Sequence, residues 1–399
     1  MHNGLIDLPT AIFDDRKNSA SVNLDIESEA FPFEERIAVE MKKQWLGGAI
    51  VDGESYYTGN DGADILAPYD RSIPVGKLYY ATAELTKKAL QSAHEYFPIW
   101  RDLSESERVK PIQQLADLLE ENMPELIALS HKEAGKTIHD GIDEVREAVD
   151  FCRYYAQQGV ANFSSPQTIK SVAGIVFTGS TPTAQFINQA LANRNVKQAT
   201  FIAETGGQRC SALRVLFVQQ DIAERVIELI KGAMDELHVG LPYLHKTDVG
   251  PVIDLKSKEQ LMEYIKKMTR TQTLVKKIAL TKECGKGDFV PPTAIEIEDL
   301  SCLTSEQFGP ILHIVRYHAA DIESLIDQVN STGFGLTMGI HSRNETHYRH
   351  IERRSRVGNC YINRDQVGVQ PFGGQGLSGT GPKAGGPRYL LRFTQQVNL

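Results

Sequence analysis

The feature that most constrains the fold is an alternation of short apolar runs and amphipathic helical patterns after residue 170. Three runs are predicted strands: residues 174–178 (GIVFT), 199–203 (ATFIA) and 213–219 (LRVLFVQ). Thr181 and Pro182 indicate a helix start after the first strand, and Asp221 is predicted to cap a helix after the third. A second alternation follows around ILHIVRY, LIDQV, LTMGIHS and CYINR. Strands separated by helices pair in parallel through right-handed crossovers, so this part of the chain predicts an α/β fold.

A block of several helices is predicted before that alternation, from residue 84 to about residue 160. Apolar residues recur every fourth position there, as one buried helix face requires: Leu85, Ala89, Ala93 and Phe97. Ser104 and Glu107 have the spacing of a capping box, which starts a helix by satisfying its free amides. The chain therefore combines a helical block with α/β units.

Composition excludes several classes of protein. The chain has 399 residues, of which 41% are hydrophobic and 24% charged, enough for two or three globular domains. Its 43 basic and 51 acidic residues give a net charge of −8 without a basic block, which argues against nucleic-acid binding in this portion. No run of about 18 apolar residues occurs, so no stable membrane insertion is expected.

The five cysteines are odd in number, scattered and without a CxxC pair. This usage is typical of a reduced, cytoplasmic protein. The eleven histidines show no ligand spacing, so no metal site is expected.

The most informative stretch is AETGGQRCSALR, residues 203–214. Cys210 lies beside Arg209, and a nearby cation favours the thiolate that a cysteine nucleophile needs. Glu204 follows a predicted strand at the carboxyl end, where α/β proteins build their sites, and could serve as a general base. Taken alone, the pair favours the plainer interpretation, a buried inert cysteine and a solvated glutamate.

The surrounding motifs occur in a characteristic order: FTGST, AETGGQ, GQRCSALRVL, EQFGP and PFGGQGLSGTGPKAGGP. Together they resemble the aldehyde dehydrogenase superfamily, most nearly the Δ1-pyrroline-5-carboxylate (glutamate semialdehyde) dehydrogenase domain of the bacterial proline-utilisation proteins called PutA. The resemblance implies NAD-dependent oxidation of L-glutamate γ-semialdehyde to glutamate in proline catabolism, with a small-molecule aldehyde as substrate.

The resemblance also implies roles for individual residues. Cys210 is the expected nucleophile, which forms a thiohemiacetal and, after hydride transfer to NAD, a thioester. Glu204 is the expected base for the water that hydrolyses the thioester. The cofactor residues are expected to be Ser180 near the pyrophosphate and Glu306 and Phe308 at the nicotinamide ribose. The substrate residues are expected to be Ser211, Phe372, Ser378, Gly379 and Thr380.

The implied fold is a parallel Rossmann-type NAD-binding domain, incomplete here, with an α/β catalytic domain and a small β oligomerisation element. The expected divisions are an N-terminal arm, helical block and start of the NAD-binding domain (1–173), a remnant of that domain (174–206), a catalytic domain (207–380) and an oligomerisation segment (381–399). The resemblance implies a homodimer or higher homo-oligomer.

The chain departs from the family in two internal places. Glu204 and Cys210 are six positions apart, whereas the family has a strand and a helix between them, roughly thirty residues. Between Phe163 and Gly174 the family's long βαβ stretch is absent, along with a Pro-Trp-Asn motif whose asparagine supplies an oxyanion donor.

Three hypotheses follow from these patterns. The first is an active semialdehyde dehydrogenase. The second is a catalytically impaired, aldehyde dehydrogenase-like scaffold that serves assembly or interaction. The third is a cofactor-free thiol hydrolase that uses Cys210 and Glu204.

Overall fold

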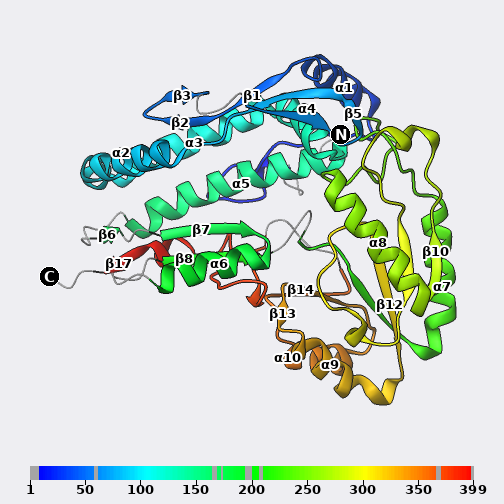
Figure 1. Ribbon diagram of the computed structural model, residues 1–399. Helices are drawn as coiled ribbons and strands as arrows, with labels where there is room; N and C mark the ends of the chain where they lie inside the picture. The colour runs from blue at the N-terminus through cyan, green and yellow to red at the C-terminus, as the bar shows by residue number, and fades with distance from the viewer. Residues whose placement is uncertain are drawn as a thin grey trace. The chain divides into compact units, whose positions relative to one another are not determined.

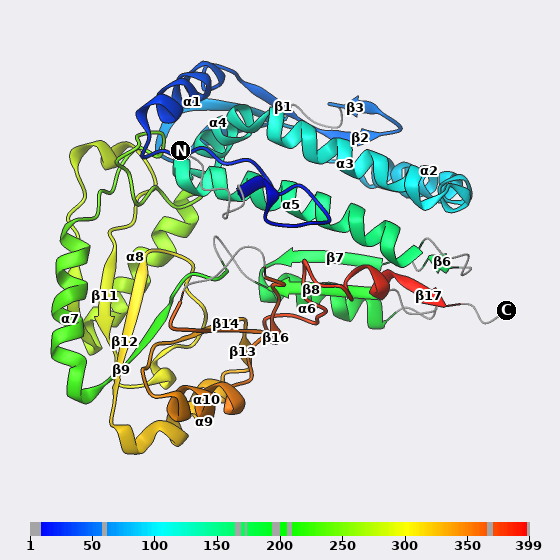
Figure 2. The ribbon, with the colours of Figure 1, turned by 180° about the vertical axis from the view of Figure 1, so that it is seen from behind.

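The structure is a computed structural model that describes residues 9–57, 62–163, 169–171, 174–193, 200–205, 210–364 and 370–396. The chain divides into two compact units and passes between them several times. Unit 1 comprises Met1–Ser164, Glu236–Glu263 and Ala279–Pro291, and unit 2 comprises Ser165–Asp235, Tyr264–Ile278 and Pro292–Leu399. Figures 1 and 2 show the elements of each unit from opposite sides.

Unit 1 begins with a helix and short strands: α1 (Glu27–Glu40), β1 (Trp45–Gly47), β2 (Ala49–Val51), β3 (Glu54–Tyr56), β4 (Ala63–Ala67) and β5 (Asp70–Leu78). β5 lies between β1, to which it is parallel, and β4, to which it is antiparallel. β2 and β3 form a hairpin whose two turn residues, Asp52 and Gly53, both have positive φ, as a tight two-residue turn requires.

The predicted helical block is confirmed in unit 1 as α2 (Ala83–Asp102), α3 (Glu105–Glu121), α4 (Met123–Ala134) and α5 (Ile138–Phe163). The capping box is confirmed at α3, where Ser104 and Glu107 exchange side-chain and backbone hydrogen bonds. α4 ends at Gly135, which has φ 66°, a conformation that glycine adopts without the strain of a Cβ.

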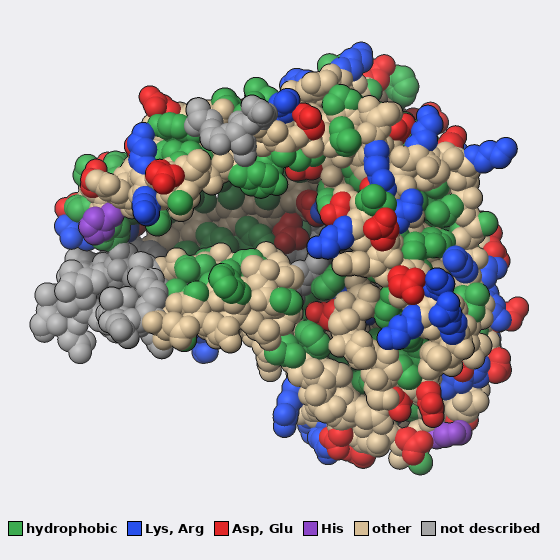
Figure 3. Space-filling model, viewed as in Figure 1, with side chains coloured by type: hydrophobic (Ala, Val, Ile, Leu, Met, Phe, Trp, Pro, Cys, Tyr) green, Lys and Arg blue, Asp and Glu red, His purple; other side chains and the backbone are tan. Residues whose placement is uncertain are grey.

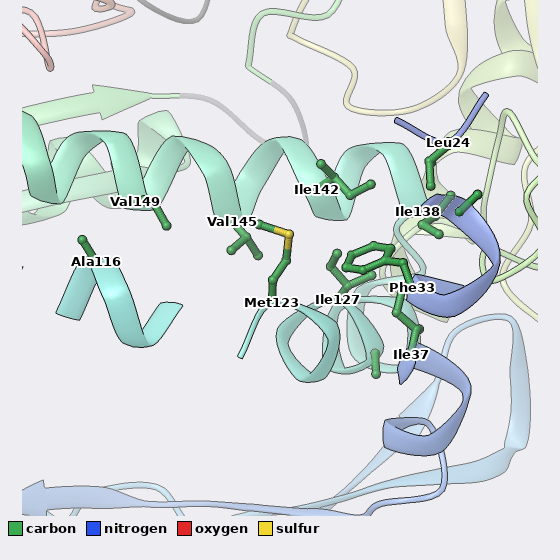
Figure 4. Close-up of a cluster of buried hydrophobic side chains, with 12 residues drawn as sticks. Leu24, Phe33, Ile37, Ala116, Met123, Ile127, Ile138, Ile142, Val145 and Val149 are labelled. Carbon is green, nitrogen blue, oxygen red and sulfur yellow. The ribbon is translucent and has the colours of Figure 1, made fainter. Parts of the chain in front are cut away.

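The core of unit 1 is built where α1, α4 and α5 meet (Figure 4). Phe33 of α1 and Ile127 of α4 point toward one another, and Met123 of α4 points toward Val145 of α5. These side chains are at most 7% exposed, so their apolar surface is removed from water almost completely. This burial stabilises the helical packing.

A polar network fastens the N-terminal segment to α3 and α5 in unit 1. Arg153 donates to Asp117 and Glu120 at 3.0 and 2.9 Å and to the carbonyl of Asn18 at 3.2 Å. Glu120 also accepts a hydrogen bond from the backbone amide of Ala20 at 2.6 Å. Burial by itself would raise the pKa of Glu120, but these donors and the Arg153 charge outweigh it and lower the pKa to about 2.

Unit 2 begins with a short strand and a βαβ unit, comprising β6 (Ile169–Ser171), β7 (Gly174–Gly179), α6 (Thr181–Ala192) and β8 (Thr200–Thr205). β7 and β8 pair in parallel, and α6 follows β7 and precedes β8 in the sequence (Figures 1 and 2). β17 (Thr394–Gln396) pairs with β6 of the same chain.

A four-stranded sheet forms the other main part of unit 2, in the order β10 (Thr273–Lys277), β11 (Thr293–Glu296), β12 (Ile311–Tyr317), β9 (Val215–Gln219). β9, β12 and β11 are mutually parallel, and β10 is antiparallel at the edge. α7 (Gln220–Asp235) contacts this sheet, and α8 (Leu255–Thr271) contributes its second half to unit 2. The remaining elements are α9 (Ile322–Ser331), β13 (Phe334–Gly335), β14 (Thr337–Ile340), α10 (Glu345–Arg354), β15 (Asn359–Ile362) and β16 (Gln375–Gly376).

The predicted strand–helix alternation is confirmed by β7, α6, β8, β9 and the later parallel pair β14–β15. The prediction that Asp221 caps a helix is wrong, because the helix begins two residues earlier than predicted. α7 begins at Gln220, and Asp221 lies in its first turn, where its carboxylate accepts a hydrogen bond from the Gln219 side chain at 2.8 Å. An acidic group in the first turn still interacts favourably with the helix dipole. The four domain divisions expected from sequence stay a prediction.

We expect Glu120→Gln to lower the free energy of unfolding at pH 7 by about 1.5–3 kcal/mol, the usual contribution of hydrogen bonds to charged groups. Because the folded-state pKa of Glu120 is about 2, below its ordinary 4.5, its stabilisation is present above pH 4.5 and lost as the pH falls toward 2. In denaturant titrations, the difference in free energy of unfolding between variant and wild type should therefore become smaller as the pH falls from 7 to 3. Glu121→Gln, on the exposed side of the same helix, is the control; a gap independent of pH would contradict the account.

Candidate active site

The carboxyl ends of β7 and β8 define one edge of the candidate site. The strands pair in parallel with Thr178 opposite Glu204 and Gly179 opposite Thr205. Ser180, which follows β7, and Glu204, near the end of β8, therefore lie at the same edge, where α/β proteins build their sites. The Glu204 side chain lies outside the described residues, so its role as a base stays a prediction.

Ser180 caps the N-terminus of α6. Its hydroxyl accepts from the Thr183 amide at 3.4 Å and lies 2.8 Å from the Thr183 hydroxyl, and Pro182 occupies the first turn. Ser180 is exposed at the start of a twelve-residue helix. Free amides and the helix dipole make such an end suitable for an anionic group such as a pyrophosphate.

Thr380 is fastened directly to β8. Its amide donates to the Ala203 carbonyl at 2.9 Å, and its hydroxyl accepts from the Ala203 amide at 3.0 Å. Ala203 is only 4% exposed, so both of these backbone groups would otherwise be removed from water without a partner. The two bonds place the predicted substrate loop beside the strand that carries Glu204.

Ser378 and Gly379 continue the same loop inside unit 2. Ser378 is 3% exposed, and its hydroxyl accepts from the Gly335 amide at 3.0 Å, which ties the loop to β13. A Cβ on Gly374 would lie 2.4 Å from the Ser378 carbonyl oxygen, so only glycine fits this close approach. Half-buried Phe372 forms a backbone bridge with Ala384 across the loop.

Cys210 lies in a turn before β9, next to Ser211, and both side chains are half-buried. The Arg214 side chain closes this turn by donating from Nη1 to the carbonyls of Cys210 and Ala212 at 3.1 and 3.3 Å. Partial exposure leaves the Cys210 thiol accessible to a reagent, as a nucleophile requires.

Glu306 and Phe308 lie before β12, and the Phe308 ring contacts the same arginine. The Arg214 guanidinium carbon lies 4.4 Å from the centroid of the Phe308 ring, within the range of a cation–π contact. Burial raises the pKa of the Glu306 carboxyl, and the positive charge of Arg214 partly opposes that shift. The Arg214 side chain thus contacts two of the predicted site residues, Cys210 and Phe308, and its charge acts on a third, Glu306.

Arg214 is the functional candidate that sequence reasoning missed. An arginine directly before the apolar strand VLFVQ, four residues after the cysteine, was the available signal. Its backbone is also held, because its carbonyl accepts from the amide and from Nδ1 of His313 at 2.9 and 3.0 Å. His313 Nε2 in turn lies 2.8 Å from the Tyr264 hydroxyl.

Two groups of predicted residues therefore emerge within unit 2. One contains Cys210, Glu306 and Phe308, and the other contains the β8 edge with Ser378 and Thr380. Residues 206–209, which join the two groups along the chain, lie outside the described residues. The pairing of the Glu204 and Cys210 side chains stays a prediction.

The described residues contain no group of three His, Cys, Asp or Glu side chains placed to hold a metal ion. Within the same residues, every helix is too short or too polar to cross a membrane.

The aldehyde dehydrogenase family pattern matches residues 57–171 and 200–399. The chain therefore belongs to the aldehyde dehydrogenase family, whose members oxidise aldehydes with NAD or NADP. Its predicted aldehyde dehydrogenase fold is confirmed by a solved structure, that of a variant of Bradyrhizobium japonicum PutA. This structure superposes with a TM-score of 0.85 at 31% identity, covering 99% of this chain and 49% of that one.

Two curated relatives place the chain more narrowly within the family. The bifunctional protein PutA of Klebsiella aerogenes is 31% identical over 501 aligned positions, which cover 95% of this chain and 38% of that protein. The protein named 1-pyrroline-5-carboxylate dehydrogenase 1 of Halalkalibacterium halodurans is 25% identical over 514 positions, covering 95% of this chain and 98% of that one. The chain thus spans little more than a third of the PutA protein that it matches.

The alignments also show that the chain is internally shortened. They contain 501 and 514 positions, whereas the chain has 399 residues, so more than a hundred positions in each relative have no counterpart here. The family pattern is interrupted over residues 172–199. These findings agree with the missing segments expected from the motifs, whose exact positions stay a prediction.

We expect Thr380→Val to lower the free energy of unfolding by about 1–3 kcal/mol, because it removes the acceptor for a buried amide. The Ala203 amide should exchange hydrogen faster in the variant, as measured by hydrogen–deuterium exchange. Thr380→Ser keeps the hydroxyl and should restore protection. Equal protection of Ala203 in the valine variant and the wild type would contradict the assigned hydrogen bond.

Proposed function

We propose that the chain catalyses the NAD-dependent oxidation of L-glutamate γ-semialdehyde to L-glutamate. The chain's family membership and its likeness to proteins named PutA and 1-pyrroline-5-carboxylate dehydrogenase support this proposal. The observation that carries it is the contact of one side chain, Arg214, with both the half-buried Cys210 and Phe308.

The reaction begins with attack of the Cys210 thiolate on the aldehyde carbon. A C–S bond forms, the carbonyl π electrons move to oxygen, and the product is a thiohemiacetal. The Cys210 backbone amide is the proposed donor to that oxyanion, the role that amides have in acyl-transfer sites. When bound, NAD supplies the acceptor for the hydride that leaves this carbon, and a thioester on Cys210 remains.

Glu204 completes the reaction as a general base. Its carboxylate takes a proton from water while the water oxygen attacks the thioester carbonyl. The C–S bond then breaks, the Cys210 thiolate is released, and the acyl group leaves as the carboxylic acid of glutamate. This acid loses the second proton of the water to solvent and becomes the carboxylate.

The residues expected at the cofactor fit a dinucleotide in chemical type. Ser180 lies at a helix N-terminus that favours an anionic pyrophosphate. Glu306 offers a carboxylate acceptor for ribose hydroxyls, and Phe308 offers an apolar face. Adenosine-binding parts of the family fall among the segments expected to be missing, so we expect weak cofactor affinity.

The loop at 378–380 is the proposed site for the α-carboxylate of the substrate. Glycine-rich backbone can direct several amides at one carboxylate because no Cβ intervenes. The Ser378 hydroxyl, which accepts from Gly335, keeps its own proton to donate. Phe372 and Ser211 are proposed to contact the aliphatic chain and the aldehyde end.

A catalytically impaired scaffold is the second candidate function, and the shortened nucleotide-binding part favours it. In the described residues β7 and β8 form a sheet of only two strands. Val176 of β7 and Phe186 of α6 are 55% and 71% exposed, and hydrophobic side chains gather at the surface over α6 (Figure 3). Exposed apolar surface of this kind is typical of contact with another protein segment.

The cellular setting and the assembly of the chain are proposed from its sequence. The five cysteines are odd in number and scattered, which supports a reducing, cytoplasmic setting. We propose a homodimer or higher homo-oligomer, in which the C-terminal segment 381–399 contributes to the contact.

We expect the purified chain, supplied with glutamate semialdehyde and millimolar NAD, to form NADH, followed by absorbance at 340 nm. Cys210→Ala should abolish the signal, because no other described group is proposed to form the thioester. Cys152→Ala, which removes a half-buried thiol of unit 1, should retain it.

The same measurement separates the two candidate functions. If wild type forms no NADH and shows no NAD binding by calorimetry at millimolar cofactor, the dehydrogenase proposal fails and the scaffold remains. Thiol-dependent hydrolysis of an activated ester without NAD, lost in Cys210→Ala, would instead favour the cofactor-free hydrolase.

A further inference from the structure

Arg214 occupies an unusual position for a positively charged side chain. It is half-buried directly before β9 in unit 2, and burial lowers the pKa of its guanidinium while the charges of Glu306 and Cys210 oppose that shift. Its Nε is buried without a hydrogen-bond partner among the described residues. Burying a charged group with one unpaired donor costs free energy, so a structural role alone explains it poorly.

The contacts of Arg214 divide between two segments that are far apart in the sequence. Through Nη1 it holds the Cys210 and Ala212 carbonyls of the turn before β9. Its guanidinium lies over the ring of Phe308, in the segment before β12. One planar, delocalised cation can make both contacts at once, whereas an ammonium group cannot stack in this way.

The backbone of Arg214 is fixed independently of its side chain. Since a carbonyl can only accept, His313 Nδ1 must carry the proton that bonds to the Arg214 oxygen at 3.0 Å. His313 Nε2 is then left to accept from the Tyr264 hydroxyl at 2.8 Å. Burial lowers the pKa of His313, which favours this neutral form. The parallel pairing of His313 with Val215 adds a further constraint on the same site.

We propose that Arg214 is a positioning residue that couples the Cys210 turn to the Glu306–Phe308 segment, so that nucleophile and ribose-binding pair are held as one unit. Its guanidinium fixes the main chain at Cys210, supplies positive charge to that turn and orients the Phe308 ring. The part of this role that concerns the cofactor rests on the proposed function, whereas the part that concerns Cys210 does not.

The test compares Arg214→Met and Arg214→Lys with the wild type. The first readout is the rate of Cys210 alkylation by iodoacetamide at pH 7.5, followed by peptide mass spectrometry and requiring no cofactor. We expect Arg214→Met to slow alkylation of Cys210 about tenfold, because a nearby cation increases thiolate character. Arg214→Lys keeps the charge and should recover most of that rate.

The second readout is the dependence of turnover on NAD. Both variants lose the planar contact with Phe308, so both should raise the KM for NAD severalfold, and the lysine variant should retain most of its kcat. Arg225→Met, which removes an exposed arginine on α7, is the matched control and should change neither readout.

Unfolding curves of all variants accompany these measurements. If Arg214→Met proves unfolded, Arg214→Lys and Phe308→Leu replace it in the test. Both of these variants should raise the KM for NAD, and in both the rate of Cys210 alkylation should stay within a few fold of wild type. A folded Arg214→Met protein with wild-type alkylation rate and wild-type KM would overturn the proposal. If wild type itself forms no NADH, the proposed function fails, while the alkylation comparison still decides whether Arg214 acts on Cys210.

Discussion

Two hydrogen bonds between Ala203 and Thr380 hold together the part of unit 2 on which the proposed chemistry depends. They join residues 177 positions apart and occupy both backbone groups of a buried strand residue. Each bond contributes only about 1 kcal/mol, but leaving the Ala203 amide buried and unpaired would cost more than that. The loop proposed to bind the substrate therefore has a strong preference for one position, beside the end of β8 that carries Glu204.

Local patterns in the sequence predicted the elements well, because periodicity and capping act over a few residues. The Ser104 capping box, the strands at β7 and β8, and the start of α6 at Thr181 were all found where expected. Family motifs then named Cys210, Glu306 and Phe308. The start of α7 lies two residues before the one predicted from Asp221, which is within the usual uncertainty at a helix end.

Contacts between distant segments could not be predicted in the same way. Arg214 was visible as a charged residue beside an apolar strand, but nothing local indicated that its carbonyl bonds to His313, 99 positions away, or that its guanidinium lies over Phe308. Parallel pairing of β9 with β12 creates both contacts. The interior electrostatics of the site thus depend on topology rather than on any motif.

More than a hundred positions of each relative have no counterpart in this chain, whereas Cys210, Arg214 and the loop at 378–380 are present. The most direct test of the central claim is intact-protein mass spectrometry of Glu204→Gln after mixing with glutamate semialdehyde and NAD. Removal of the base should slow hydrolysis of the thioester, so the account predicts a glutamyl adduct that maps to Cys210. Absence of any adduct on Cys210, in a folded variant whose thiol still reacts with iodoacetamide, would contradict it.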